Sequence, residues 1–408
     1  MLSYQAARFK VLEAALTRFH SRPPESMDIS DTPGAALGRV LAEDVHADRD
    51  YPPFDRSVRD GVAVRAVDVV KVPARLKALG ESKAGASFPG AVTPGECVYI
   101  MTGAAVPAGS DSIVMIENTK ADGEWVIVEQ RAQPGDHIVR AGAEARVGTV
   151  VIPRGKYLGY AEISVAAQVG AVKLKLLPRP RVGFLSTGDE LVPAHEIPGV
   201  HAIRNSNSIS LAAQAVQAGA EPVALGTAKD DEADLRRAIE RGLAEEILVI
   251  TGGVSMGKYD LVEKVLKEAG TEFYFESVAI RPGRPAVFGV CRNKLVFALP
   301  GNPVSAMVTF EVLVAPAIQA LSGRTPRPPA LFKAKAKHDL DEKPGLVHFL
   351  PARLEFSGDG PTVEIVPWQG SGDAIALVNA NCFAVVGAEQ SHIAAGDPVD
   401  VWPRRGYL

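Results

Sequence analysis

The sequence predicts a protein of the α/β plus β class with several domains. Strands and helices alternate from residue 181 to residue 321, a pattern typical of a mostly parallel sheet covered by helices on both faces. Before this region, short β-type runs separated by Gly and Pro fill residues 51–139. After the TPRPPA segment, alternating runs such as TVEIVPW and PVDVWP follow. We therefore expect a β-rich N-terminal module, a three-layer α/β domain and a C-terminal β domain.

The composition is that of a globular protein. The chain has 408 residues, of which 47% are hydrophobic and 23% are charged. Its length is sufficient for two to four domains. The net charge is −4 and there is no basic run, which argues against nucleic acid as a partner. No apolar run reaches the roughly 18–20 residues that cross a bilayer, and the N-terminus lacks a signal-peptide pattern, so we expect no membrane association. The three cysteines lie far apart, so we expect neither a disulfide framework nor a zinc site, and a cytoplasmic location.

The N-terminal segment predicts two helices. Phe9, Leu12, Leu16 and Phe19 recur at helical spacing, so we expect an amphipathic helix that packs on protein through this face. A membrane-surface helix is the weaker alternative, because Glu is mixed with Arg and Lys on the polar face. The Thr-Pro pair at 32–33 predicts the N-cap and first residue of a short second helix.

In the α/β region each predicted strand leads into a helix. The strands are RVGFLST, EPVALGTA, EEILVIT and LVFALP, and the helices span 208–218, 234–243, 261–269 and 304–321. A further helix is expected at 160–169, before this region. This order implies parallel strands whose carboxyl ends share one edge of the sheet.

Three of the turns that follow these strands carry glycine and polar side chains. Ligands of open α/β sheets bind outside the carboxyl ends of the strands, so we expect the turns to line one crevice. Glycine lets a ligand approach the backbone, and amides at a helix start favour an anion such as phosphate. One such turn alone is more often an ordinary connection, but three on one edge favour a site. The residues are Ser186, Thr187, Gly188, Asp189 and Glu190, then Gly252, Gly253 and Ser255, then Pro300, Gly301, Asn302 and Pro303.

Four acidic residues, Asp189, Glu190, Asp230 and Asp260, gather at the same predicted edge. Carboxylate oxygens suit Mg²⁺ held between a protein and a phosphate. Helix capping explains Asp230 and Asp260 equally well, because both lie where N-caps of predicted helices belong. Helix capping explains the acidic side chain of Glu190 less well than those of Asp230 and Asp260.

The RPGRP motif places Arg281 and Arg284 around a rigid turn beside the predicted crevice. Guanidinium groups bind oxyanions through forked donors, so this turn is a candidate oxyanion site. A solvated surface turn is the alternative.

In this order, the motifs resemble those of the molybdopterin molybdenumtransferase family, MoeA, to which the gephyrin E domain also belongs. The likeness covers nearly the whole chain, and the ordered set is far more specific than any one motif. The motifs are ALGRVLAEDV at 36–45, DRSVRDGVAVRA at 55–66, MTGAAVPAGSDSIVMIE at 101–117, FLSTGDELV at 184–192, TGGVSMGKYD at 251–260, RPGRPAVFG at 281–289, LPGNPVSAMVTFE at 299–311 and QGSGD at 369–373.

The resemblance implies an elongated four-domain subunit that forms a homodimer. We expect a discontinuous N-terminal domain at 1–48 with 140–176, a small β-rich domain at 49–139, a molybdopterin-binding-like α/β domain at 177–323 and a β-barrel-like domain at 324–408. The implied reaction inserts molybdate into the dithiolene of adenylylated molybdopterin and releases AMP by Mg²⁺-assisted cleavage. Expected partners besides a second copy and the pterin nucleotide are an upstream adenylyltransferase and downstream molybdoenzyme chaperones.

The matching motifs also imply the roles of individual residues. The catalytic acids would be Asp60, Glu144, Glu190, Asp230 and Asp260, with Glu190 and Asp260 as metal ligands. Substrate binding would involve Thr102, the three glycine-bearing turns, Arg281, Arg284 and Ser371.

Several positions depart from the family pattern. The usual DNSAMDGYA is DRSVRDGVA here, which introduces Arg56 and Arg59, and the usual GED is GAE, ending in Glu144. A family lysine is replaced by Ser277 and a family arginine by Pro351, while Lys-Pro-Gly-Lys-Pro has Arg at both basic positions. The molybdate pocket has therefore lost up to two cations, whose charge Arg56 and Arg59 could replace.

Three functions are compatible with the sequence. The favoured one is an active molybdenum insertase, because the acids and cleft turns are present. The second is a non-catalytic paralog that binds pterin nucleotide or a partner protein as a scaffold, which the departures would explain. The third is an adenylyltransferase-like enzyme, against which the extra domains and acids argue. Molybdate and tungstate are too alike for the sequence to separate them.

Overall fold

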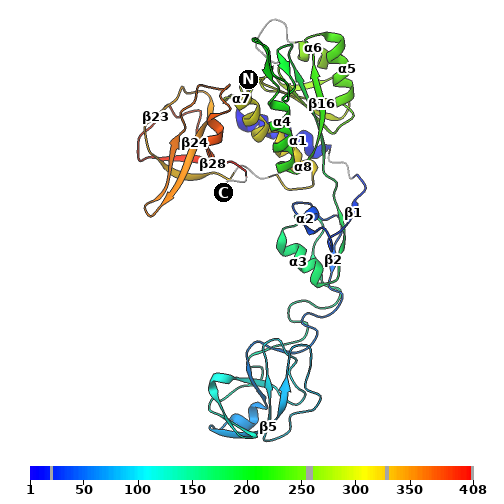
Figure 1. Cartoon of the computed structure of the whole chain (residues 1–408), viewed down its shortest axis with the longest axis vertical. Coiled ribbons are helices and arrows are strands. Elements are labelled where there is room, and N and C mark those ends of the chain that lie inside the picture. Colours follow the sequence, from blue (N-terminus) through cyan, green and yellow to red (C-terminus); the bar gives the residue numbers. More distant parts are fainter. Residues whose placement is uncertain (19–21, 254–260, 327–329, 406–408) are drawn as a thin grey trace. The chain divides into compact units, whose positions relative to one another are not determined.

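The computed structural model (Figure 1) describes residues 1–18, 22–253, 261–326 and 330–405. Contacts divide the chain into two compact units. Unit 1 comprises Met1–Glu25, Gly38–Val40 and Lys175–Leu408, and unit 2 comprises Ser26–Leu37 and Leu41–Leu174. The strands β1 (Glu25–Asp28) and β12 (Lys173–Leu176), which pair with each other, span the boundaries between these segments.

Unit 1 contains a six-stranded mixed sheet. Four strands are parallel, in the order β16 (Glu221–Ala228), β13 (Arg181–Thr187), β17 (Ile247–Thr251) and β21 (Lys294–Leu299). The strands β20 (Val287–Cys291) and β18 (Glu272–Phe275) extend the sheet in antiparallel fashion. The carboxyl ends of the four parallel strands therefore share one edge, as the alternating pattern predicts.

Helices cover both faces of this sheet, which gives three layers (Figure 1). Side chains alternate along each strand, so that Phe184 and Phe297 belong to one apolar core while Leu185 and Val296 belong to the other. The first face carries α4 (Asn207–Ala218), α7 (Pro303–Thr309), a π-helical turn (Phe310–Val314) and α8 (Ala315–Leu321), and the second carries α5 (Glu232–Gly242) and α6 (Leu261–Glu268).

The first helix, α1 (Tyr4–Thr17), is present, but its predicted buried face is only partly correct: Leu12 packs against the core, Phe9 and Leu16 do not, and Phe19 lies outside the described residues. Phe9 is 67% exposed and Leu16 55% exposed. The buried residues are Ala7, Val11, Ala14 and Ala15, and the helix packs on α8 and on the π-helical turn before it. Small side chains allow the helix to lie close to these neighbours, which a pattern of large apolar residues does not reveal. The Thr-Pro pair does start a short helix, α2 (Pro33–Ala36), although the Thr32 side chain makes no capping bond.

By length and composition, the continuous helix Pro303–Leu321 is apolar enough to cross a membrane. However, 78% of its apolar window is buried inside unit 1, where it packs against α1 and α4. It is accounted for as the core helix of the α/β domain.

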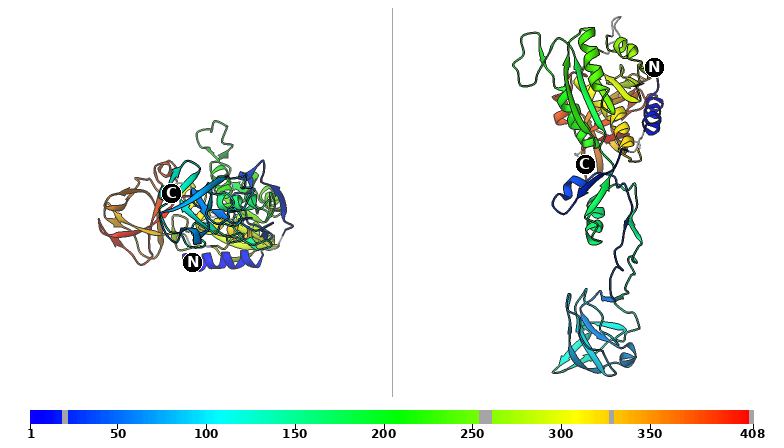
Figure 2. Two further views of the ribbon diagram at one scale, coloured as in Figure 1. Left: turned by 90° about the horizontal axis from the view of Figure 1, so that it is seen from below. Right: turned by 90° about the vertical axis from the view of Figure 1, so that its right-hand side faces the viewer.

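The C-terminal part of unit 1 is a closed five-stranded barrel. Its strands pair in the order β24 (Val347–Ser357), β25 (Gly360–Ile365), β22 (Phe332–Ala336), β28 (Pro398–Pro403) and β26 (Cys382–Val386), and β26 pairs back with β24. The short strand β19 (Ile280–Arg281) from the α/β region pairs with β24. Smaller elements are β23 (Leu340–Asp341), β27 (His392–Ile393) and the 3₁₀ turn Ala376–Asn379. In the α/β domain, β14 (Leu191–Val192) pairs with β15 (Ile203–Arg204), and the segment between them projects from the domain (Figure 2).

Unit 2 is built mainly from β structure. Its six-stranded sheet has the order β7 (Ser112–Met115), β4 (Gly61–Val64), β6 (Glu96–Ile100), β5 (Ala74–Ser82), β9 (Trp125–Val128) and β8 (Thr119–Asp122). Two short pairs join β3 (Arg56–Ser57) with β10 (Ile138–Val139) and β2 (Val45–His46) with β11 (Val150–Ile152). The remaining elements are α3 (Tyr160–Gln168) and the 3₁₀ turns Ala66–Val69 and Ile116–Asn118. The expected fold class, an α/β domain with a β-rich module and a β-barrel-like domain, is confirmed; the four domain boundaries stay predictions.

Candidate active site

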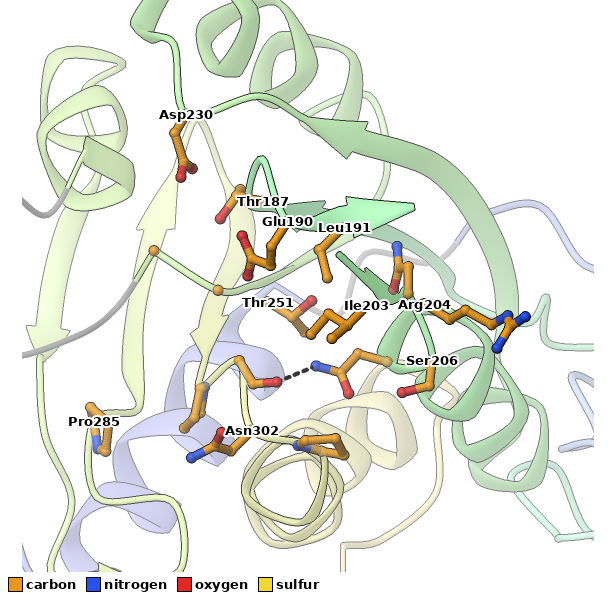
Figure 3. Close-up of a pocket in the computed structure, with 18 residues that line it drawn as sticks. Thr187, Glu190, Leu191, Ile203, Arg204, Ser206, Asp230, Thr251, Pro285 and Asn302 are labelled. Atoms are coloured by element: carbon orange, nitrogen blue, oxygen red, sulfur yellow. Dashed lines mark hydrogen bonds between the residues drawn. The ribbon is translucent and has the colours of Figure 1, made fainter. Parts of the chain in front are cut away.

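A pocket of about 450 Å³ opens at the carboxyl ends of the parallel strands (Figure 3). All three glycine-bearing turns contribute to its lining, as does the connection between β15 and α4. The lining residues are Thr187, Gly188, Glu190, Leu191, Ile203, Arg204, Asn205, Ser206, Asn207, Asp230, Thr251, Gly252, Gly253, Pro285, Pro300, Gly301, Asn302 and Pro303.

The first turn needs glycine because of its backbone conformation, and the Glu190 side chain folds back over it. Gly188 has φ +139°, and a Cβ atom there would lie 2.5 Å from Glu190 Oε2. Glycine tolerates this backbone conformation, which side chains rarely adopt. Ser186 lies beneath the turn, where its Oγ is 3.2 Å from Asn205 Oδ1 and 3.1 Å from Thr251 Oγ1. The predicted Ser186 is thus a buried support for the pocket and does not line it.

The second turn packs directly on the first. Gly252 has φ +91°, and a Cβ atom there would lie 2.6 Å from the carbonyl oxygen of Thr187. Gly253 has φ +64°, and its Cβ would lie 2.5 Å from Val262 Cγ2. The backbone therefore forms this part of the pocket wall, with no room for a side chain. The predicted Ser255 and Asp260 lie outside the described residues.

The third turn is tied to the C-terminal barrel region and to α4. Asn302 Nδ2 donates to Ser371 Oγ at 2.9 Å, and the amide of Val304 donates to the Ser371 carbonyl at 3.0 Å. On the other side, Asn207 Nδ2 donates to the Gly301 carbonyl at 2.7 Å. The predicted Ser371 therefore lies at the start of α7, next to the turn.

The structure separates the capping acid from the pocket acid. Asp231 is the N-cap of α5 and accepts a bond from the amide of Asp234 at 2.9 Å. Asp230 lines the pocket, and its amide lies 3.3 Å from Asp189 Oδ1. Burial raises the pKa of the Asp230 carboxyl, and the negative charges of Asp189 and Glu190 raise it further. Capping therefore does not account for Asp230, and this acidic edge favours a cation.

The acidic edge could contribute oxygen ligands to a cation. In the described ranges there is no group of three or more His, Cys, Asp or Glu side chains that could hold a metal ion. Asp230 and Glu190 make no ion pair with another described residue, and carboxylate oxygens of this kind could hold Mg²⁺ together with phosphate oxygens and water.

The RPGRP turn meets the pocket at Pro285, whereas its two arginines lie elsewhere. Arg281 is in β19, is 56% exposed, and its Nη1 lies 3.8 Å from Glu342 Oε2 of the barrel region. Glu342 in turn lies 2.8 Å from Nδ1 of the fully buried His348. Arg284 is exposed, and its carbonyl accepts bonds from the amides on either side of the turn, those of Val278 and Ala286.

Three predicted residues belong to unit 2. Asp60 accepts a bond from the amide of Thr102 at 2.7 Å, and this bond holds the pKa of the Asp60 carboxyl below its usual range. Glu144 forms an ion pair of 2.7 Å with Arg56. The charge of Arg56 is thus directed at a predicted catalytic acid, and Arg59 is exposed.

The sequence reasoning missed the connection between β15 and α4. Ile203, Arg204, Asn205, Ser206 and Asn207 all line the pocket. Asn205 is buried and organises the floor, since its Nδ2 donates to Thr227 Oγ1 at 3.2 Å and its Oδ1 accepts from the Ser208 amide at 3.2 Å. The signal was available: the polar run RNSNS directly precedes the predicted helix at 208–218.

Comparisons with known proteins agree along the whole chain. Family models match at residues 2–170 (MoeA N-terminal region, domain I and II), 183–320 (probable molybdopterin binding domain) and 333–403 (MoeA C-terminal region, domain IV). The chain is similar to the molybdopterin molybdenumtransferase of Nostoc sp., with 34% identity over 90% of this chain and 86% of the relative. Its identity to that of Haemophilus influenzae is 33%, over 99% and 98% of the two chains. A crystal structure of the molybdopterin biosynthesis moeA protein from Pyrococcus horikoshii superposes with a TM-score of 0.83 at 26% identity, covering 99% of this chain and 100% of that one.

Proposed function

Because the chain belongs to the MoeA family, we propose that it is a molybdopterin molybdenumtransferase that inserts molybdate into adenylylated molybdopterin and releases AMP. The resemblance inferred from the ordered motifs is confirmed by the three family models and by the relatives. The observation that carries the proposal is the pocket whose wall combines three backbone turns with an acidic edge. The scaffold alternative is not favoured.

The backbone turns would bind the nucleotide part of the substrate. Gly252 and Gly253 leave the backbone bare at the pocket wall, so a phosphate can approach it closely. The turn at 300–303 is held by Ser371 and Asn207, which fixes its position before the ligand binds. Such preorganisation reduces the ordering that binding would otherwise require.

The acids would act at the bond that breaks. AMP leaves when water cleaves the phosphoanhydride bond between the adenylate and the pterin phosphate. Asp230 and Glu190 would hold Mg²⁺ with the substrate phosphates, and the ion would neutralise charge that develops on the oxygen leaving with AMP. The raised pKa of Asp230 fits this role, because a bound cation would relieve the repulsion that Asp189 and Glu190 exert on its charged form. We include Asp260 in this set on the basis of its motif.

We propose in addition that the protein is a homodimer and that it is cytoplasmic. The exposed apolar side chains on α1, Phe9 and Leu16, support a homodimer, because contact with a second copy would bury them. The three buried free cysteines support a reducing, cytoplasmic setting. Roles for Asp60, Thr102 and Glu144 in the reaction, and an upstream adenylyltransferase and downstream chaperones as partners, rest on the family likeness.

The test is release of AMP by the purified protein. Adenylylated molybdopterin, Mg²⁺ and molybdate are incubated anaerobically with the protein, and AMP is followed over time. We expect release above the no-enzyme control that depends on both molybdate and Mg²⁺. No release above that control would overturn the proposal and favour a scaffold.

A further inference from the structure

We propose that Arg204 binds a phosphate group of the ligand at the end of the pocket opposite the acidic edge. This inference deepens the proposed function and rests on the same pocket. It assigns a binding role to a residue that none of the sequence motifs points to.

Charge is distributed unevenly around the pocket. The charged side chains among its described lining residues are Glu190, Asp230 and Arg204. Figure 3 shows the two carboxylates on one side of the view and the guanidinium on the other. A ligand with phosphate groups would be repelled by the acidic edge unless a cation were bound there, whereas Arg204 attracts phosphate directly. The polarity of the pocket therefore places at least one phosphate at the Arg204 end.

The Arg204 side chain is held in place by one hydrogen bond and has further donors. It lies on β15, in register with Val192 of β14, and its Nε donates to the Glu196 carbonyl at 2.9 Å. This bond orients the guanidinium through Nε and leaves the two Nη groups available to a ligand. In the described part of the chain Arg204 has no ion pair, in contrast to Arg281 beside Glu342. A planar guanidinium oriented in this way can offer two parallel donors to a phosphate.

The start of α4 adjoins Arg204 in the chain. Ser206, the N-cap, is exposed and its side chain makes no capping bond. A helix of 12 residues directs the positive end of its dipole to this place. The side chain and the helix end therefore add donors and positive potential to those of Arg204.

An independent observation points to a ligand at the same place. Asn207, the first residue of α4, is about nine-tenths buried and lines the pocket. Its Nδ2 donates to the Gly301 carbonyl, an atom that can only accept, which fixes the orientation of the amide. The remaining atom, Oδ1, is buried without a hydrogen-bond partner. An unpaired buried acceptor is unfavourable, so a ligand that brings a donor next to its phosphate would be preferred.

These features define the chemical class of the ligand group. It is a phosphate ester or phosphoanhydride whose attached body carries an N–H or O–H donor. The adenylate phosphate and the phosphate of the pterin side chain share this chemistry, so the experiment must separate them.

The test compares ligand binding to Arg204→Gln, Arg204→Lys and a matched control. Arg292→Gln removes an exposed arginine that pairs with Glu240 through two contacts of 2.7 and 2.8 Å. Because Arg292 precedes β21, it lies at the sheet edge opposite the pocket. AMP and molybdopterin are titrated separately by calorimetry, without molybdate, and thermal unfolding confirms that each variant is folded.

We expect Arg204→Gln to lower the affinity for at least one of the two ligands by about tenfold to a hundredfold, which is the range for loss of a charge-assisted contact. Arg204→Lys should give a smaller loss, because it keeps the charge but not the fork, and Arg292→Gln should bind as wild type. A loss confined to AMP, or to molybdopterin, supports the proposal and identifies which phosphate Arg204 binds.

Binding of both ligands by folded Arg204→Gln within twofold of wild type would overturn the proposal, and so would an equal loss in Arg292→Gln. Failure of the proposed function is a separate result. If the wild type releases no AMP but Arg204→Gln still loses affinity for AMP or molybdopterin, the proposed insertase function is wrong, whereas the proposed phosphate site is supported.

Discussion

Gly252 and Gly270 form a matched pair that tests how the backbone builds the pocket. Both have φ +91°, so an alanine at either position meets the same conformational strain of about 1–2 kcal/mol. They differ in the space around them. A Cβ at Gly252 would lie 2.6 Å from the Thr187 carbonyl oxygen, whereas a Cβ at Gly270 would have nothing within 4 Å. The difference between Gly252→Ala and Gly270→Ala therefore isolates the contact between the two turns.

The expected loss of stability in Gly252→Ala depends on whether the atoms in contact can move apart. The contact partner is backbone, and it belongs to β13, which is paired with β17 just before the turn, so neither side yields easily. Overpacking of this kind costs about 1–3 kcal/mol. We expect Gly252→Ala to be less stable than Gly270→Ala by that amount, or to displace the turn and lose AMP affinity at least about tenfold.

The assay is thermal unfolding together with calorimetric titration of AMP, on both variants and wild type. Gly270→Ala should lose stability modestly and bind AMP normally, because Gly270 follows the end of α6, away from the pocket. If the two variants unfold at the same temperature and bind AMP equally well, the close packing of the turns is not what shapes the site.

Glu190→Gln and Asp260→Asn should each slow AMP release by about 10²–10³-fold with little change in thermal unfolding, because each removes a charge but keeps the side-chain shape; near-normal turnover in both would exclude them from the mechanism. Sedimentation should show a homodimer that Phe9→Glu weakens, and a 43.1 kDa monomer at micromolar concentration would contradict this. Burial raises the pKa of the Cys97 and Cys382 thiols to about 12, so alkylation of the native protein should stay slow up to about pH 10 and become fast only after denaturation; rapid labelling at pH 8 would show that the thiols are accessible.

The sequence predicts those parts of the fold and site that follow from local order along the chain. Each of the four parallel strands is followed along the chain by a polar turn and, further on, by a helix, so the position of the turns at one sheet edge can be derived without knowing which strands are neighbours. The pocket-lining residues of the three turns follow from this rule. Sequence alone could not separate Asp230 from Asp231, because both precede α5 and only the backbone conformation decides which one caps it.

Features that depend on contacts between distant segments were missed. The buried face of α1 is set by how closely it approaches α8, and the sequence shows large apolar residues that lie on the exposed side. Arg204 and Asn207 were overlooked because the short pair of β14 and β15 brings their segment back over the first turn. The polar run before the predicted helix at 208–218 marks the start of that helix, but it does not show that the segment returns over the first turn.

The paired arginines bear on the cations that the family pattern would place near molybdate. Arg56 lies 2.7 Å from Glu144, and Arg281 lies 3.8 Å from Glu342, so both charges already have an acidic neighbour. These pairs are partly exposed, and exposed pairs contribute only about 0–1 kcal/mol, so an incoming oxyanion can compete for either arginine at little cost. Competition would nevertheless leave a carboxylate beside the anion. Arg204 makes no ion pair with another described residue and lines the pocket itself, so binding there requires no such pair to be broken. On electrostatic grounds, an anionic group of the substrate should therefore bind more readily at Arg204 than at Arg281 or Arg56.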